Sequence, residues 1–181
     1  MKTLGLIGGM SPESTVSYYQ IINREINRRL GGNHSADLLM HSVNFATIAA
    51  LQSSGNWSQA GKVLAESAVK LEQMGAQAIV LATNTMHKVA PTIEEAVKVP
   101  LIHVVDATAD AIKARGLHKV ALLGTRFTMS DGFYSERMQQ LGVHTLIPND
   151  QQQSEIHRVI FEELCRNRFT AEAKQYYLDV I

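Results

Sequence analysis

Short apolar runs alternate with longer amphipathic stretches along the chain. Three of these runs, residues 2–7, 37–43 and 78–82, have the composition of strands buried on both faces of a parallel sheet. A fourth run covers residues 101–105, directly after Pro100. The segments between the runs carry apolar residues at helical spacing. Strands that alternate with crossover helices predict an α/β fold whose parallel sheet has helices on both faces.

Polar residues mark where the predicted helices begin. Ser and Asp side chains accept hydrogen bonds from the first turn of a helix, and Pro fits the first helical position. Pro12 follows such a cap, and the pair Gly31-Gly32 ends that first helix. The predicted caps or first residues of the following helices are Asn44, Ser58, His87 and Asp106.

The second half of the chain repeats features of the first. Residues 119–127 have the strand, turn and charge pattern of residues 2–10, and residues 144–150 correspond to the strand at 37–43. Phe169-Thr170 echoes Trp57-Ser58, with an aromatic residue before a hydroxyl cap. Such an internal duplication predicts two pseudo-symmetric, flavodoxin-like α/β domains with parallel sheets. We place them at residues 1–98 and 99–181.

The repeat also predicts what the second domain lacks. In the first copy, Ser58 precedes Ala82-Thr83 by 24 or 25 residues. The same spacing, counted from Thr170, extends beyond the last residue, Ile181. We therefore expect the second domain to be truncated, without its later strand or strands.

Three small polar residues follow the third strand and form the main candidate site. Thr83, Asn84 and Thr85 lie where open parallel sheets hold small ligands, and they precede a predicted helix. Their side chains and the N–H groups of that helix are suited to a bound anion. The alternative is that Thr83 or Asn84 only caps the helix.

Further candidates for the same cleft come from other turns. Met10 and Ser11 end the turn Gly8-Gly9-Met10-Ser11, whose glycines let a ligand approach the backbone. Gln52 follows the second strand and is either a ligand contact or a solvated surface amide. Thr125 occupies the equivalent turn of the second half and either contacts ligand or caps the next helix.

Composition excludes several classes of protein. Seventeen basic and seventeen acidic side chains cancel, so we expect neither a nucleic-acid nor a membrane partner. No signal peptide and no apolar stretch of about 20 residues is present. The single cysteine, Cys165, is typical of the cytoplasm and is interpreted as a packing or surface thiol. The histidines lack metal-ligand spacing, so no metal is expected, and neither a GxGxxG nor a Walker motif occurs.

The placed motifs resemble those of the aspartate/glutamate racemase family along the whole chain. The matching residues are Gly8-Gly9-Met10-Ser11, the segment Thr83-Asn84-Thr85-Met86-His87 and Leu123-Gly124-Thr125. The resemblance implies a cofactor-independent enzyme that inverts the α-carbon of an acidic amino acid in a cleft between two domains. Family members carry Cys-Asn-Thr-x-His where this chain has Thr83 at the cysteine position. Their second cysteine, in a Gly-Cys-Thr-Glu motif, is expected here beyond residue 181.

Racemisation requires two acid/base groups on opposite sides of one carbon. We interpret Thr83 as the weaker group on one side and the expected cysteine as the stronger group on the other, because a hydroxyl is far less acidic than a thiol. Asn84, Thr85 and backbone N–H groups would hold the substrate carboxylate. His87 is either a structural hydrogen-bond donor or a proton relay.

Other functions remain open at this point. A non-catalytic protein that binds small carboxylates would keep Asn84 and Thr85 without the thiols. Another isomerase or a decarboxylase of the same superfamily, or a nucleotide-binding module, would also fit parts of the pattern. The only protein assembly that we expect as an alternative to a monomer is a homodimer.

Overall fold

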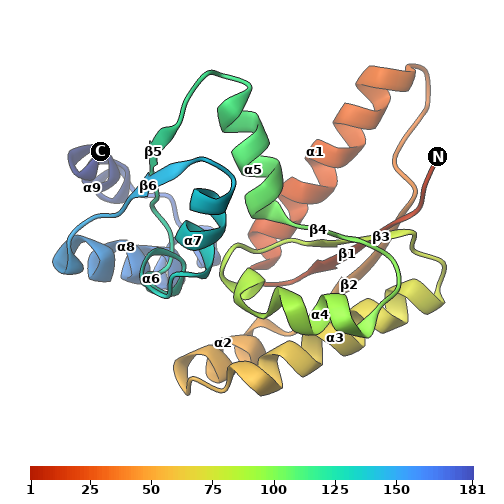
Figure 1. The fold of residues 1–181 in the computed structure, drawn as a ribbon, viewed down its shortest axis with the longest axis horizontal. Coiled ribbons are helices and arrows are strands. Elements are labelled where there is room, and N and C mark those ends of the chain that lie inside the picture. Colours follow the sequence, from red (N-terminus) through yellow and green to blue (C-terminus); the bar gives the residue numbers. More distant parts are fainter. The chain divides into compact units, whose positions relative to one another are not determined.

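The computed structural model describes residues Met1–Ile181 and divides the chain into two compact units. The first unit covers Met1–His103 and the second covers Val104–Ile181. Both are built from helices and parallel strands, so the fold is of the predicted α/β class (Figure 1).

The first unit is organised around a sheet of four parallel strands in the order β2-β1-β3-β4. The strands are β1 (Leu4–Gly8), β2 (Leu38–Ser42), β3 (Ala78–Leu81) and β4 (Leu101–Ile102). This is the strand order of flavodoxin-like sheets, in which a crevice forms between β1 and β3 because the chain leaves these two strands in opposite directions. Gly8 pairs with Ser42 and Ile7 with Leu81, so β1, β2 and β3 end at the same edge.

Helices cover this sheet on both sides. They are α1 (Pro12–Leu30), α2 (Phe45–Ser53), α3 (Trp57–Gln73), the 3-10 helix η1 (Thr85–Val89) and α4 (Ala90–Ala96). Figure 1 shows α1 on one side of the sheet and α3 and α4 on the other. The main core lies on the α3 side and includes the fully buried Leu64, Ile79 and Ile93. Burying each such side chain contributes roughly 1.5–3 kcal/mol relative to leaving it exposed.

The unit boundary differs from the predicted one between residues 98 and 99. Leu101 and Ile102 pair with β3, so β4 belongs to the first sheet and the first unit reaches His103. Helix α5 then begins at Val104, inside the run that we expected to be a strand. Asp106 is therefore not the predicted cap; it lies in the first turn of α5, and its carboxylate pairs with Arg137.

Two predicted caps of the first unit have different outcomes. Ser11 caps α1 as predicted, because its hydroxyl accepts a hydrogen bond from the amide of Ser14. The cap of α3 is Asn56 and not Ser58: the side-chain oxygen of Asn56 accepts from the amide of Gln59 at 3.2 Å. The helix therefore starts one residue before Ser58, at Trp57.

The second unit contains a parallel pair of strands and six helical segments. The elements are α5 (Val104–Lys113), β5 (Lys119–Ala121), α6 (Arg126–Ser130), α7 (Phe133–Gln140), β6 (His144–Leu146), α8 (Asp150–Glu162), η2 (Leu164–Arg166) and α9 (Ala171–Val180). Strand β5 pairs with β6 in parallel, as β1 does with β2. The connecting segment differs: α1 is one helix, whereas α6 and α7 are separated at Gly132, whose φ is +81°.

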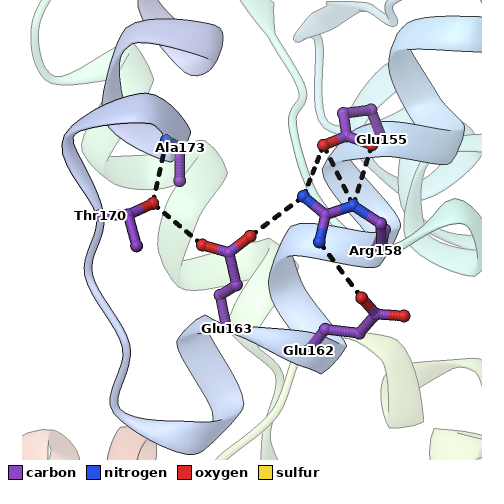
Figure 2. Close-up of polar contacts among 6 residues, drawn as sticks. All are labelled: Glu155, Arg158, Glu162, Glu163, Thr170 and Ala173. Carbon is purple, nitrogen blue, oxygen red and sulfur yellow. Dashed lines mark hydrogen bonds and ion pairs between the residues drawn. The ribbon is translucent and has the colours of Figure 1, made fainter.

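A polar network joins α9 to the end of α8. Arg158 pairs with Glu155, Glu162 and Glu163, and the second oxygen of Glu163 accepts a hydrogen bond from the hydroxyl of Thr170 (Figure 2). Thr170 in turn caps α9, as predicted, by accepting from the amide of Ala173 at 3.1 Å.

No helix of either unit has both the length and the apolar character needed to span a membrane.

Candidate functional site

The candidate site of the first unit lies at the edge where β1 and β3 end. The turn after β1 carries Met10 and Ser11, and the segment after β3 carries Thr83, Asn84 and Thr85. The amide of Ala82 donates to the carbonyl of Ile7 at 2.9 Å, so the pairing of the two strands continues to the residue before Thr83. The structure therefore places both predicted segments at one edge, on neighbouring strands, at the switch point of the sheet.

Thr83 has a fixed backbone and an unpaired hydroxyl. Its amide donates to the carbonyl of Leu81 at 2.9 Å, and its carbonyl lies 2.7 Å from Nδ1 of His87. The side chain is half-buried, and its hydroxyl has no hydrogen-bond partner in the protein. No carboxylate or imidazole of the first unit therefore bonds to this hydroxyl, so its acidity is not raised by a bonded base.

Asn84 and Thr85 begin η1, and they differ in exposure. The Asn84 side chain is exposed and makes no capping hydrogen bond, whereas Thr85 is buried. The alternative that Asn84 caps the helix is therefore wrong. Because η1 is a 3-10 helix of five residues, an anion at this position would depend on local N–H and side-chain donors more than on a helix dipole.

The turn after β1 is held by Thr15 of α1, which is not among the predicted site residues. The Thr15 hydroxyl accepts from the amide of Gly9 and donates to the carbonyl of Ser11, both at 2.8 Å. A Cβ on Gly8 would lie 2.3 Å from Cγ2 of Thr15, and one on Gly9, where φ is +92°, would lie 2.2 Å from the carbonyl of Val43. These glycines are required by packing inside the protein itself. A hydroxyl residue at the fourth helical position after a glycine turn is the signal that would have identified Thr15.

Met10 and Ser11 are both buried, but they have different surroundings. Met10 is part of the main core cluster, together with Ile48 and Met86. Ser11 remains at the start of α1, where its side chain and its carbonyl bind the first turn of the helix. Met10 thus belongs to the apolar core of the first unit.

Gln52 is buried in α2, so the alternative of a solvated surface amide is wrong. Its side chain is 4% exposed, and Nε2 lies 2.9 Å from the sulphur of Met86 in η1. Sulphur accepts and does not donate here, so the amide is oriented with its nitrogen toward Met86. Oε1 is then left buried without a hydrogen-bond partner. An unsatisfied buried oxygen is unfavourable by about 1–3 kcal/mol, which makes this atom a candidate acceptor for a ligand.

Two buried histidines adjoin the segment after β3. The ring of His87 is 4.4 Å from that of His103 between centroids, with an edge-on angle of 64°. His103 follows β4 directly, and both rings are nearly inaccessible, at 3% and 6% exposure. The pairing brings together a residue of η1 and the residue that follows β4, and no local sequence pattern indicates it.

Thr125 belongs to the second unit and caps α6. Its hydroxyl accepts from the amide of Thr128 at 3.3 Å and lies 3.1 Å from the Thr128 hydroxyl. Arg126, beside it, donates its amide to Nδ1 of His157 at 3.1 Å. The capping role is therefore confirmed, and a ligand contact of Thr125 stays a prediction.

No set of three or more His, Cys, Asp or Glu side chains is arranged to hold a metal ion. Cys165 is half-buried in the short helix η2, in the second unit. It lies at the end of a helical segment and not at the end of a strand.

Comparisons with known proteins agree on one family. The family model for Asp/Glu/hydantoin racemases matches residues 7–181. The broad specificity amino-acid racemase RacX of Bacillus subtilis strain 168 is 25% identical over 159 residues, which are 87% of this chain and 69% of that protein.

Solved structures give the same picture. A Yersinia pestis protein assigned to the Asp/Glu racemases is 46% identical with a TM-score of 0.90, over 100% of this chain and 79% of the other. An aspartate racemase homologue from Pyrococcus horikoshii OT3 is 38% identical with a TM-score of 0.76, over 93% of this chain and 74% of the other.

Proposed function

Because this chain belongs to the Asp/Glu/hydantoin racemase family, we propose that it racemises an acidic amino acid, aspartate or glutamate, by proton transfer at the α-carbon. The proposal needs no cofactor, since the carbanion is stabilised by hydrogen-bond donors around the carboxylate. RacX, a relative, acts on amino acids with broad specificity, and the restriction to acidic substrates is our own inference.

One observation carries the proposal. At the switch point of the first sheet, Thr83 presents an unpaired hydroxyl on a fixed backbone, next to the exposed side chain of Asn84. Polar groups without protein partners on a rigid support are what a small polar ligand requires. We assign Thr83 the proton transfer on one side of the α-carbon.

The remaining predicted residues receive binding roles in the proposal. Asn84 and Thr85 would donate to the α-carboxylate, where charge develops when the proton leaves. Gln52 Oε1, a buried acceptor without a partner, would bind an N–H of the substrate ammonium group. Met10 and Ser11 would line the site, and Thr125 is proposed as a contact from the family resemblance.

The reaction balances with two groups and no oxidant. One group removes the α-proton, and the electron pair is delocalised into the carboxylate. The opposite group donates its proton to the other side of the carbon, so the two groups exchange protonation states and solvent resets them. We propose that the second group is a thiol, as the family resemblance implies.

Deuterium exchange tests this function. The protein is incubated in D₂O with L- and D-aspartate and with L- and D-glutamate, and deuterium at the α-carbon is followed by proton NMR. We expect deuterium in the product enantiomer, and a loss of about 10²–10⁴-fold in Thr83→Ala. Binding of the amino acid without any exchange would contradict the proposal.

A second candidate is a non-catalytic protein that binds small carboxylates. The observation that favours it is the Thr83 hydroxyl, which has no bonded base to activate it. This candidate predicts that acidic amino acids bind in a calorimeter, that no deuterium is incorporated, and that Thr83→Ala leaves the affinity within about twofold.

A further inference from the structure

A hydrogen bond connects the candidate proton-transfer residue to a buried histidine. Nδ1 of His87 lies 2.7 Å from the carbonyl oxygen of Thr83. A carbonyl oxygen only accepts, so Nδ1 must carry a hydrogen and donate it. The contact therefore fixes the orientation of the ring with Nδ1 as the donor.

The other peptide groups around Thr83 are also bound. Its amide donates to Leu81, and the amide of the preceding Ala82 donates to Ile7, each at 2.9 Å. His87 supplies the donor for the one remaining group, the Thr83 carbonyl. The main chain at Thr83 is thus held from both sides, while the hydroxyl has no partner.

His87 is itself held in place. The ring is buried at 3% exposure and packs edge-on against His103 at 4.4 Å. Its amide donates to the carbonyl of Asn84 at 3.1 Å, in the first turn of η1. A donor on such a support cannot move without disturbing the end of β4 and the start of η1.

We propose that His87 is a positioning residue: through Nδ1–H it fixes the Thr83 carbonyl and so sets where the Thr83 hydroxyl and the Asn84 side chain meet the substrate. This inference rests on the proposed function. His87 acts through a hydrogen bond to the main chain and takes no part in proton transfer. Misplacing a reacting group by about 1 Å lowers rates by on the order of 10²-fold, which sets the expected effect.

Two substitutions distinguish the role of the hydrogen bond from the role of the imidazole ring. In His87→Asn, the side-chain nitrogen occupies the place of Nδ1 and keeps the donor for Thr83. In His87→Gln, the nitrogen occupies the place of Nε2, so the donor to Thr83 is lost. His118→Gln, at an exposed position of the second unit, is the control for replacing a histidine elsewhere.

The two variants should behave differently in the exchange assay. We expect His87→Gln to lose about 10- to 100-fold in kcat with KM changed by less than about threefold. His87→Asn should keep kcat within about threefold of the unmodified protein, with an unchanged pH profile. Equal loss in both variants would mean that the imidazole itself transfers protons, and equal retention would mean that the bond is unnecessary; either result overturns the inference.

A second measurement does not depend on activity. Amide hydrogen exchange of residues 83–86 reports the order of this segment, and we expect faster exchange in His87→Gln but not in His87→Asn. If the unmodified protein incorporates no deuterium, the proposed function fails, and this measurement still decides the role of His87. Equal exchange in the two variants would overturn it. Thermal unfolding of both variants checks that each is folded.

Discussion

The side-chain nitrogen of Gln52 lies 2.9 Å from the sulphur of Met86, which connects a buried amide of α2 to the helix after β3. The amide is only half satisfied, because Oε1 has no protein partner. Such a group lowers stability in the unliganded protein and gains a partner only when a donor arrives.

Replacing Gln52 by Met should separate stability from binding. We expect Gln52→Met to leave the free energy of unfolding unchanged or to raise it by about 1 kcal/mol, because a buried unpaired oxygen is removed. The KM for an acidic amino acid should rise about tenfold. Urea unfolding and steady-state racemisation measure the two effects. Loss of stability with an unchanged KM would make Gln52 a structural residue only.

Thr83→Cys should change the balance between the two directions of racemisation. The equilibrium constant between enantiomers is one, so kcat/KM must be equal in both directions, and asymmetry can appear only in kcat and KM separately. A thiol has a pKa near 8.5 and therefore forms its basic thiolate near neutral pH far more readily than a hydroxyl forms an alkoxide. We expect the ratio of the two kcat values to move toward one. Polarimetry from each enantiomer measures it, and Thr83→Ser, which keeps the hydroxyl, should leave the ratio unchanged.

Thr15 should limit the size of the side chain that position 8 can accept. Gly8→Ala would place a methyl group 2.3 Å from Cγ2 of Thr15, and we expect a loss of about 1–3 kcal/mol of stability. Thr15→Ser removes that methyl group but keeps the hydroxyl that bonds Gly9 and Ser11. A double-mutant cycle should therefore show that Thr15→Ser recovers part of the loss. If the effects of the two substitutions were additive, residues other than Thr15 would have to move to relieve the close contact.

Acid should weaken the attachment of α9 through Glu163. Hydrogen bonds from Thr170 and Arg158 lower the pKa of Glu163, so its stabilising effect is present above the ordinary value of about 4.3 and is lost as pH falls through the lowered value. We expect the Tm of the protein to fall below pH 4.5, and Glu163→Gln to flatten that fall. Glu162→Gln, which removes a more exposed partner of the same arginine, should flatten it less.

Mild acid should act on the second unit through His157. Burial, and then the nearby Arg126, lower the pKa of His157, whose Nδ1 accepts the Arg126 amide. The unfolded chain therefore binds the proton first, and stability should decrease as pH falls below about 6.5. His157→Asn keeps an oxygen as acceptor and cannot titrate, so it should remove this part of the pH dependence of Tm. Retention of the full dependence would contradict the assignment.

The strands of the first sheet could be predicted from the sequence because they depend on strong local signals. The apolar run at residues 78–82 and its abrupt polar end identified β3 and where it stops. Ser11 and Thr170 were recognised as caps because a hydroxyl precedes an amphipathic helix in each case. These features need no knowledge of distant contacts.

Other features depend on contacts that local patterns do not contain. Val104 and Val105 are β-branched and suit a strand, yet they begin α5, where packing against α7 overrides their propensity. Ser58 was predicted as the cap of α3, but the cap is Asn56, two residues earlier, and both residue types are good caps. The burial of Gln52 depends on Met86, which lies in another element.

The amide and the carbonyl of Thr83 are both hydrogen-bonded, and neither bond involves the side chain of residue 83. Serine, cysteine or selenocysteine can therefore occupy this position on the same rigid scaffold, each with a different intrinsic acidity. Residue 83 can thus be replaced without moving the backbone. A series of such replacements would relate the reaction rate to the acidity of one side-chain atom whose location stays constant.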